Sequence, residues 1–519
     1  MASRLALFTY ALFFLISYSE AQEIRIKVID DSDGQPVPFC HICCENKETG
    51  QQAYHVGDIN GEATVTLAEN VILSVSAMGY ENYLESTPGA EELFEIRLKP
   101  SYFGLDEVVV TGQYKAVSVD KSIYNIKYIG KPSIENQAAN TMAELLSKEL
   151  NFRINNDPST GSSLDLQGIS GENVKILVDG VPVIGRLDGN IDLSQINLDN
   201  VDHIEIVEGP MSVIYGSNAL AGVVNIITRE NKYSQFRTGV RGYYESVGVY
   251  NLNGSVDTRF GNHGLSFVGG RNFFGGYSLA DTSRSQEWKP KEQYNGGASY
   301  SFRKERTSLR YKIDFFRENL LDRSNLFPPY YEKGTDTWFT TTRFNNSLHF
   351  DQNLKAGNNI HVLAAYSYYD RRKTKYLKDL TTLDTVLIPN PAEHDTSTFH
   401  SITARGGFNH ALEEGKLDYQ IGFDINTENG TGKRMQGGEE MIGDYALFAS
   451  LQWHITKQFT FQPALRGSYN TKYESPLTPS LNIKYEYKNS ILRASYARGF
   501  RAPSLKELYL QFYDSNHQI

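Results

Sequence analysis

Three cysteines and a histidine cluster near the start of the sequence, and they are the first candidates for chemistry. Cys40, His41, Cys43 and Cys44 carry the donor atoms for a zinc site or a disulfide. Structural zinc takes four ligands, and no second pair of Cys or His follows at a matching spacing. In a strand, Cys40 and Cys44 would lie about 13 Å apart, which exceeds disulfide reach. We therefore predict free, mostly buried thiols and no metal site.

Catalytic signatures are missing from the 519 residues. The sequence has no H-E-x-x-H helix, no phosphate-binding P-loop and no nucleophile elbow. Its 51 Lys+Arg against 61 Asp+Glu leave a net charge of −10, so no basic surplus points to nucleic acid. Aromatic residues make up 12% of the chain, with 33 Tyr and 43 Gly, which suits β structure with many exposed rings. We predict a mainly β protein that is not an enzyme and needs no cofactor.

The N-terminus predicts export. Arg4 precedes an apolar run at 5–16 that is too short to span a bilayer as a helix. Small residues then precede Gln22, as at a signal-peptide cleavage site. We predict a signal peptide over 1–21. No later apolar run has the length of a membrane-spanning helix, so any insertion into a membrane would be as a β-barrel.

Residues 22–100 predict a small antiparallel β-sandwich. Alternating stretches such as 24–28 and 63–67 are separated by turns rich in Asp and Gly. The order of these stretches, with P-V-P at 36–38 and M-G-Y-E at 78–81, resembles the carboxypeptidase-regulatory-like domain. That resemblance implies a fold and no peptidase activity.

The segment 117–229 mixes predicted helix and strand. Residues 141–146 predict an amphipathic helix with Asn140 as its cap. Residues 174–178 predict a strand that runs into a turn. Glycines recur between β-prone runs further along, where sharp turns or close backbone contacts are needed.

Three motifs in this segment, in order, resemble the plug domain of TonB-dependent outer-membrane receptors. They are V-D-G-V-P at 178–182, E-G-P-x-S-x-x-Y-G at 208–216 and G-V-x-N-I at 222–226. The residues that carry the resemblance are Asp179, Gly180, Glu208, Gly209, Pro210, Tyr215, Gly216, Gly222 and Asn225. The resemblance implies an α/β plug domain over 117–229 inside a barrel in a Gram-negative outer membrane.

From residue 230 onward, apolar and polar residues alternate over stretches of about ten residues, which is typical of transmembrane barrel strands with their apolar side facing lipid. We predict about thirteen antiparallel strands. They lie at 235–245, 249–261, 263–273, 292–303, 307–318, 338–351, 359–371, 398–411, 415–427, 443–454, 458–470, 479–487 and 490–498. Plugged transporters have 22 strands, so we expect 230–519 to be an incomplete barrel, from a fragment or truncated product that lacks about nine strands.

A short valine-rich stretch precedes the plug. It comprises Asp106, Glu107, Val108, Val109, Val110 and Thr111. Such a peptide can add an edge strand to a partner's sheet, although a plain linker or a last strand of the sandwich fits the local sequence equally well. The resemblance implies that this stretch is the box that pairs with TonB, within a linker over 101–116, and that the N-terminal domain lies in the periplasm.

The connections after most odd-numbered strands are long, which predicts that they face the outside and the ligand. The candidate ligand residues are Tyr330, Tyr331, Arg498, Phe500, Arg501 and His517. An aromatic girdle at the membrane interface is the alternative for such rings, and an ordinary loop histidine is the alternative for His517. R-G-F-R-A-P at 498–503 resembles a box of haem receptors, which siderophore and cobalamin receptors also carry. The resemblance therefore implies uptake of a scarce nutrient, with ferric siderophore or haem favoured. Cobalamin or glycan import, or a non-transporting surface binding protein, are the alternatives.

Overall fold

The computed structural model describes residues 22–509, apart from 32–33, 48–51, 68–70, 78–79, 81–82, 87–92, 100–106, 158–160, 187–190, 232–233, 280–282, 413–414, 434, 436 and 489. The predicted signal peptide, Asp106 and His517 lie outside the described residues. The chain divides into two compact units, Met1–Glu107 and Val108–Ile519. Among the described residues, no helix has the length and apolar character needed to cross a bilayer.

Two sheets build the first unit. One contains β4 (Glu62–Leu67), β1 (Gln22–Asp30) and β7 (Leu93–Leu98), and the other contains β3 (Gln52–Val56), β2 (His41–Asn46), β5 (Val71–Ser76) and β6 (Tyr83–Ser86). Alternate residues of these strands fill one apolar core. β7 pairs with β1 in parallel, so the sandwich is mixed and not wholly antiparallel as predicted. Cys40 and Cys44 are buried, Cys43 is partly exposed, and all three are free thiols.

The plug is built on a five-stranded sheet and a three-stranded sheet. The larger sheet has the order β10 (Asn125–Gly130), β16 (Val201–Glu208), β17 (Gly222–Thr228), β14 (Val174–Val178) and β15 (Val181–Pro182); the smaller has β11 (Phe152–Asp157), β12 (Gly161–Leu166) and β13 (Ile169–Ser170). Short helices cover them: α2 (Lys131–Asn136), α3 (Met142–Leu146) and α4 (Ser212–Tyr215), with 3-10 turns η1 (Val119–Lys121), η2 (Gly171–Asn173) and η3 (Leu193–Gln195). β16 and β17 are buried along nearly their whole length, because both faces of the sheet are covered.

The N-terminus of α3 differs from the prediction by one residue. Thr141 is the cap, and its side chain accepts a hydrogen bond from the Glu144 backbone N–H at 3.3 Å. The Glu144 carboxylate in turn accepts from the Asn140 backbone N–H at 2.8 Å. This pair of hydrogen bonds resembles a capping box and satisfies two backbone donors at once.

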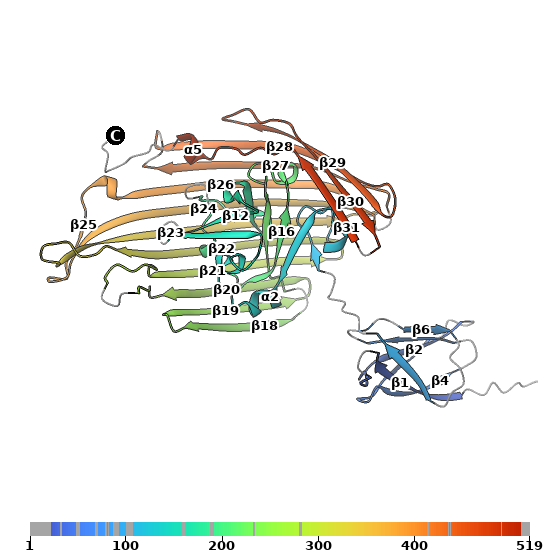
Figure 1. The fold of residues 1–519 in the computed structure, drawn as a ribbon. Helices are drawn as coiled ribbons and strands as arrows, with labels where there is room; N and C mark the ends of the chain where they lie inside the picture. Colours follow the sequence, from blue (N-terminus) through green and yellow to red (C-terminus); the bar gives the residue numbers. More distant parts are fainter. Residues whose placement is uncertain are drawn as a thin grey trace, which may run out of the picture. The chain divides into compact units, whose positions relative to one another are not determined.

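The third part is one antiparallel sheet that confirms the predicted strands. Its thirteen successive strands are β18 (Phe236–Glu245), β19 (Val249–Phe260), β20 (His263–Phe274), β21 (Lys291–Lys304), β22 (Thr307–Arg323), β23 (Lys333–Asn353), β24 (Asn358–Asp379), β26 (Asp395–His410), β27 (Leu417–Gly432), β28 (Glu439–His454), β29 (Phe459–Asn470), β30 (Thr478–Tyr487) and β31 (Ser490–Ala497). A short strand β25 (Thr385–Leu387) pairs with β24 alone, and helix α5 (Leu505–Tyr509) follows β31. The plug elements lie against one face of this sheet (Figure 1).

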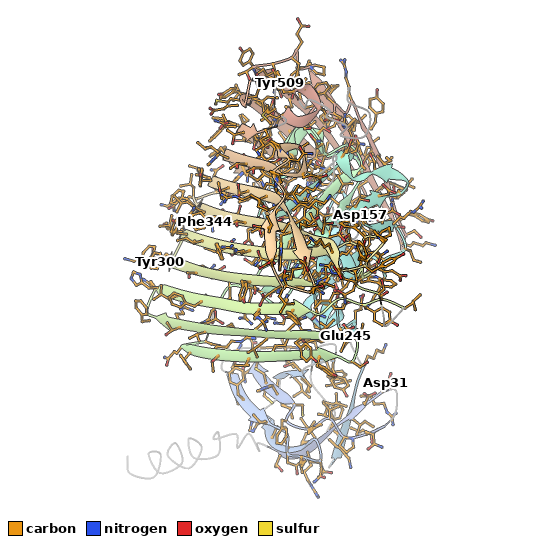
Figure 2. All side chains as sticks on the ribbon, turned by 90° about the vertical axis from the view of Figure 1, so that its left-hand side faces the viewer. Asp31, Asp157, Glu245, Tyr300, Phe344 and Tyr509 are labelled. Atoms are coloured by element: carbon orange, nitrogen blue, oxygen red, sulfur yellow. The ribbon has the colours of Figure 1, made fainter. Side chains whose placement is uncertain are left out.

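Burial in this sheet is inverted relative to a water-soluble sandwich. Along β27, Asp418, Gln420 and Asp424 are buried against the plug side, whereas Leu417 and Ile421 are exposed. Exposed apolar side chains recur on the other strands too. In Figure 2, Phe344 of β23 and Asp157 of the plug lie on opposite sides of the view. An apolar outer face and a polar inner face are the arrangement of a barrel wall in lipid.

Strands β22 to β24 are longer than alternation predicts. β23 has 21 residues and β24 has 22. β24 continues past the predicted end at residue 371 through a run of basic residues, and its hairpin with β25 projects beyond the neighbouring strands (Figure 1). The alternation ends where lipid ends, but the backbone ladder continues into water, so the sequence pattern marks only the membrane part of each strand.

Candidate coupling site

The valine-rich segment is docked on the plug. Residues 108–116, part of the expected linker over 101–116, belong to the second compact unit, which begins at Val108. Val108–Val109 form the short strand β8, which pairs with β9 (Val117–Ser118). The Val109 side chain is 0% exposed and lies in a plug core with Ile123 and Tyr124. Because it overlaps the expected TonB-pairing box at 106–111, we call Val108–Gln113 the coupling segment.

A buried carboxylate holds the backbone of the coupling segment. Glu205 of β16 is 0% exposed. Its Oε1 accepts from the Val110 N–H at 2.9 Å and its Oε2 accepts from the Thr111 N–H at 2.7 Å. Hydrogen bonds to charged groups each stabilise by about 1.5–3 kcal/mol, so this clamp is a principal contact of the segment. Sequence reasoning missed Glu205, which looks there like any polar residue in an alternating strand.

Two of the motif residues hold the same segment. The Tyr215 hydroxyl accepts from the Gly112 N–H at 3.1 Å. Asn225 Nδ2 donates to Thr111 Oγ1 at 2.8 Å, while its Oδ1 accepts from the Gly180 N–H at 3.0 Å. Tyr215 ends α4 and Asn225 lies within β17, so two separate elements present their side chains to one stretch of backbone.

His203 provides the charge that balances Glu205. Its Nε2 lies 3.0 Å from Glu205 Oε1 and its Nδ1 lies 2.8 Å from Asp202 Oδ2. The imidazole also stacks on Tyr128, with ring centroids 4.7 Å apart. Burial opposes the charged imidazole, but the hydrogen bonds to the two carboxylates outweigh it and raise the pKa of His203 to about 9. His203 is therefore an imidazolium at neutral pH, and it offsets the cost of a buried carboxylate.

We expect docking of the coupling segment to weaken at alkaline pH. Because the folded pKa of His203 lies above its ordinary value of about 6.5, the stabilisation is complete below that value and is lost as pH rises through about 9. A spin label at Val108→Cys, with the native cysteines replaced by serine, reports the released fraction. His203→Gln should release part of the segment at neutral pH and flatten the alkaline transition, while His55→Gln in the first unit should behave as wild type. If the alkaline transition is unchanged in His203→Gln, another titratable group causes it.

Asp179 joins the plug to the sheet around it. Its carboxylate accepts from Thr228 N–H at 2.9 Å and Thr228 Oγ1 at 2.6 Å. It also forms ion pairs with Arg310 at 3.3 Å and Lys312 at 3.1 Å, both on β22. Burial alone would raise the pKa of Asp179, but these cations hold it well below its usual range. The aspartate of V-D-G-V-P therefore seats the plug against the barrel wall.

The remaining motif residues serve the plug itself. Glu208 accepts from Asn125, Asn151 and Gln167, which ties β16 to neighbouring plug segments. Gly222 has a φ of +153°, and a Cβ there would lie 2.3 Å from the Val207 carbonyl oxygen. Gly209 and Pro210 form the turn between β16 and α4.

The candidate ligand residues fall into two separate groups. Tyr330 and Tyr331 lie between β22 and β23 and are 80% and 60% exposed. Arg498, Phe500 and Arg501 follow β31, and the Phe500 ring lies 5.6 Å from that of Tyr473. Within the described part of the chain, no hydrogen bond or ring contact joins the two groups. Arg501 pairs with Glu172 of the plug and with Glu507, so it is not the unopposed cation that an anionic ligand would meet.

A cavity of about 180 Å³ lies between the plug and the inner face of the sheet. Lys175, Ser217 and Asn218 line it from the plug. Asp444 and Tyr473 line it from the barrel strands and their connections. Nothing in the spacing of these residues along the chain signals that they meet.

Two family models match the chain. The TonB-dependent receptor plug domain matches residues 118–223, and the TonB-dependent receptor-like β-barrel matches residues 223–518. No carboxypeptidase-regulatory-like family model matches the N-terminal domain.

Curated relatives and solved structures agree with these two family models. The vitamin B12 transporter BtuB of Vibrio cholerae is 25% identical over 414 residues, which cover 78% of this chain and 64% of the relative. The ferric enterobactin receptor of Pseudomonas aeruginosa is 23% identical over 71% of this chain and 57% of that protein. The siderophore receptor PirA from Acinetobacter baumannii superposes with a TM-score of 0.61 at 17% identity, over 74% of this chain and 62% of PirA, which shows a shared fold. The chain thus spans less than two thirds of the length of these proteins.

Proposed function

This chain belongs to the family of TonB-dependent receptors, and from that premise we propose that it takes up a scarce nutrient across the outer membrane, driven by TonB through the box at 106–111. Receptors of this family are non-enzymatic barrels of the Gram-negative outer membrane. TonB in the periplasm, outer-membrane lipid and a small nutrient are the partners that this role requires.

The docked coupling segment is the observation that carries the proposal. Its Val110 and Thr111 N–H groups are held by Glu205, and its Gly112 N–H by Tyr215. Strand addition to a partner's sheet uses backbone N–H groups of this kind. The segment therefore cannot keep its clamp and pair fully with TonB at the same time. Release from Glu205 would then be the step that makes the receptor ready for TonB.

We favour a ferric siderophore or haem as the nutrient. R-G-F-R-A-P at 498–503 supports both, and several similar proteins are siderophore receptors by name. A cobalamin is the second candidate, because the V. cholerae relative is a vitamin B12 transporter.

The test is uptake by a strain that lacks its own receptors and expresses the full-length protein. Labelled ferric enterobactin, haemin and cyanocobalamin are supplied separately, each with and without TonB. We expect one of them to accumulate at least tenfold faster when TonB is present. Accumulation that is equal without TonB would contradict energy coupling, whereas no accumulation of any probe would exclude these three nutrients.

The first unit is proposed to be a carboxypeptidase-regulatory-like domain in the periplasm. Its two-sheet sandwich with one apolar core and the turn held by Asp58 support this. Protease accessibility tests the location: a protease added to intact cells should leave this domain uncut, and the same protease should reach it once the outer membrane is permeabilised. Cleavage of the domain in intact cells would contradict a periplasmic location.

Tyr330 and Tyr331 are proposed to contact the nutrient. Replacing both with alanine is expected to weaken its binding roughly tenfold, since two rings contribute about 1.5 kcal/mol together. The control is Tyr244→Ala with Tyr250→Ala, an exposed pair on the outer wall whose ring centroids lie 5.3 Å apart. Binding of the probe to isolated outer membranes is measured beside the amount of inserted receptor. Lost insertion with unchanged affinity in the first variant would assign these rings to the membrane interface instead.

A further inference from the structure

Tyr215 contacts two parts of the molecule at once. On one side its hydroxyl holds the Gly112 N–H of the coupling segment at 3.1 Å. On the other side its ring lies under the guanidinium of Arg405, whose Cζ is 4.8 Å from the ring centroid. Arg405 belongs to β26 of the barrel wall. Building on the proposed function, we propose that Arg405 is a positioning residue for the coupling segment, so that the barrel wall sets its release through Tyr215.

The barrel holds Arg405 in a fixed place. Its Nε and Nη2 lie 3.1 and 3.0 Å from Asp424 Oδ1 on β27. Asp424 is 0% exposed, and its second oxygen lies 3.0 Å from Nη2 of Arg466 on β29. Arg405 and Arg466 are themselves buried. These three buried charges have little freedom to move independently, because each one depends on the others to offset its loss of hydration.

The same network also contacts the backbone of α4, through Arg466. Arg466 Nη1 donates to the Val213 carbonyl at 3.5 Å, within the helix that ends at Tyr215. Arg405 therefore fixes the ring of Tyr215, and Arg466 fixes the backbone just before it. A cation over an aromatic face in a desolvated site contributes more than it would in water. The hydroxyl of Tyr215 is thus aimed at Gly112 by groups of the barrel and not by the plug alone.

The network also borders the cavity between plug and barrel. Arg466 Nη2 lies 3.2 Å from Asp444, which lines that cavity together with Lys175. A charged group that entered the cavity beside Asp444 would compete for Arg466 and alter its hold on Asp424. A two-state element that both sites bias is the physical basis of such coupling, and here that element is the docked or released coupling segment.

The experiment uses the full-length receptor in outer-membrane vesicles, without ligand, with a spin label at Val108→Cys in a background that lacks the native cysteines. Tyr215→Phe keeps the ring under Arg405 but removes the acceptor for Gly112. Arg405→Gln removes the cation, and Arg405→Lys keeps the charge beside Asp424 but loses the planar group above the ring. We expect Tyr215→Phe and Arg405→Gln each to raise the released fraction about fivefold, and Arg405→Lys to give an intermediate value.

The double variant decides whether the two residues act together. If Arg405 acts through Tyr215, the double variant should release no more than the larger single variant. Arg271→Gln is the control, because Arg271 also lies over a ring, that of Phe273, but on an exposed face of the sheet. Additive effects, or a released fraction in Arg405→Gln equal to that of the control, would overturn the proposal.

Two further measurements distinguish a misfolded barrel, a failure of the positioning role and a failure of the proposed function. Heat-modifiable migration in gels reports whether each variant barrel is folded, and Arg405→Lys carries the test if Arg405→Gln is not. Binding of the periplasmic domain of TonB to the wild type tests the proposed function itself. Normal TonB binding with no effect of Arg405 would refute only the positioning role. Absent TonB binding with a responsive label would refute only the energy coupling.

Discussion

Replacing Val109 with proline is expected to abolish uptake while leaving ligand binding intact. Proline removes a backbone N–H from the middle of the box, and with it a donor for any partner strand. Val109 is also fully buried, and it lies opposite Val117 in the β8–β9 pair. The variant should therefore lose its docked position as well as its pairing with TonB. The proposed ligand contacts at Tyr330 and Tyr331 do not involve this residue.

The measurement is accumulation of the transported probe beside its binding to isolated membranes. We expect accumulation to fall at least tenfold and affinity to stay within twofold of wild type. Val108→Thr is the matched control, because Val108 is half-exposed and threonine keeps both the N–H and the β-branched shape. Normal accumulation in Val109→Pro would show that 106–111 is a linker and that the TonB-pairing box lies elsewhere.

Gly216→Val is expected to loosen the seating of the plug. Gly216 has φ +75° and ψ −151°, a conformation that is essentially restricted to glycine, and placing another residue there costs about 1–3 kcal/mol. A Cβ would also lie 2.9 Å from Arg466 Nη2. Arg466 is 2% exposed and is held by Asp424 and Asp444, so it cannot yield without breaking buried ion pairs. Backbone strain and the clash with Arg466 therefore both destabilise the variant.

Limited trypsin digestion of receptor in outer membranes measures the effect. The plug of Gly216→Val should be cleaved at least tenfold faster than that of wild type. Gly209→Val separates the two causes, because Gly209 also has a positive φ, +111°, but a Cβ there would meet no atom within 4 Å. We expect an intermediate rate for it. Equal resistance of Gly216→Val and wild type would show that the plug tolerates displacement of Arg466.

Alternation predicts the wall of this protein well because lipid imposes it. A strand with lipid on one side and plug on the other must alternate, so the pattern at 249–261 closely matches β19, which lies at Val249–Phe260. The pattern at 359–371 stops short of the end of β24, which continues to Asp379. Above the membrane both faces of the strand meet water, and the sequence carries no periodic signal there although the hydrogen-bonded ladder goes on.

The coupling site could be predicted only in part. Tyr215 and Asn225 stand out as motif residues, but their role depends on contacts with Gly112 and Thr111, more than 100 positions earlier in the chain. Glu205 has no motif-like neighbourhood at all. A polar residue in an alternating strand is expected to face solvent, and only the tertiary fold reveals that this one is fully buried beneath the coupling segment.

The length of β23 and β24 has a consequence for the proposed capture of a nutrient. At about 3.3 Å per residue they extend about 70 Å, and at the usual tilt they rise about 50 Å against an apolar band of about 25 Å. The outer part of the wall is therefore hydrogen-bonded ladder and not loose loop. When a ligand binds to a preformed rigid rim, the protein loses little conformational entropy. When long mobile loops must close over a ligand, the free-energy cost is about 0.5–1.5 kcal/mol for each side chain immobilised. On this side of the lumen, the receptor can thus bind a ligand tightly without first ordering its loops. Such binding favours rapid capture of a ligand present at very low concentration.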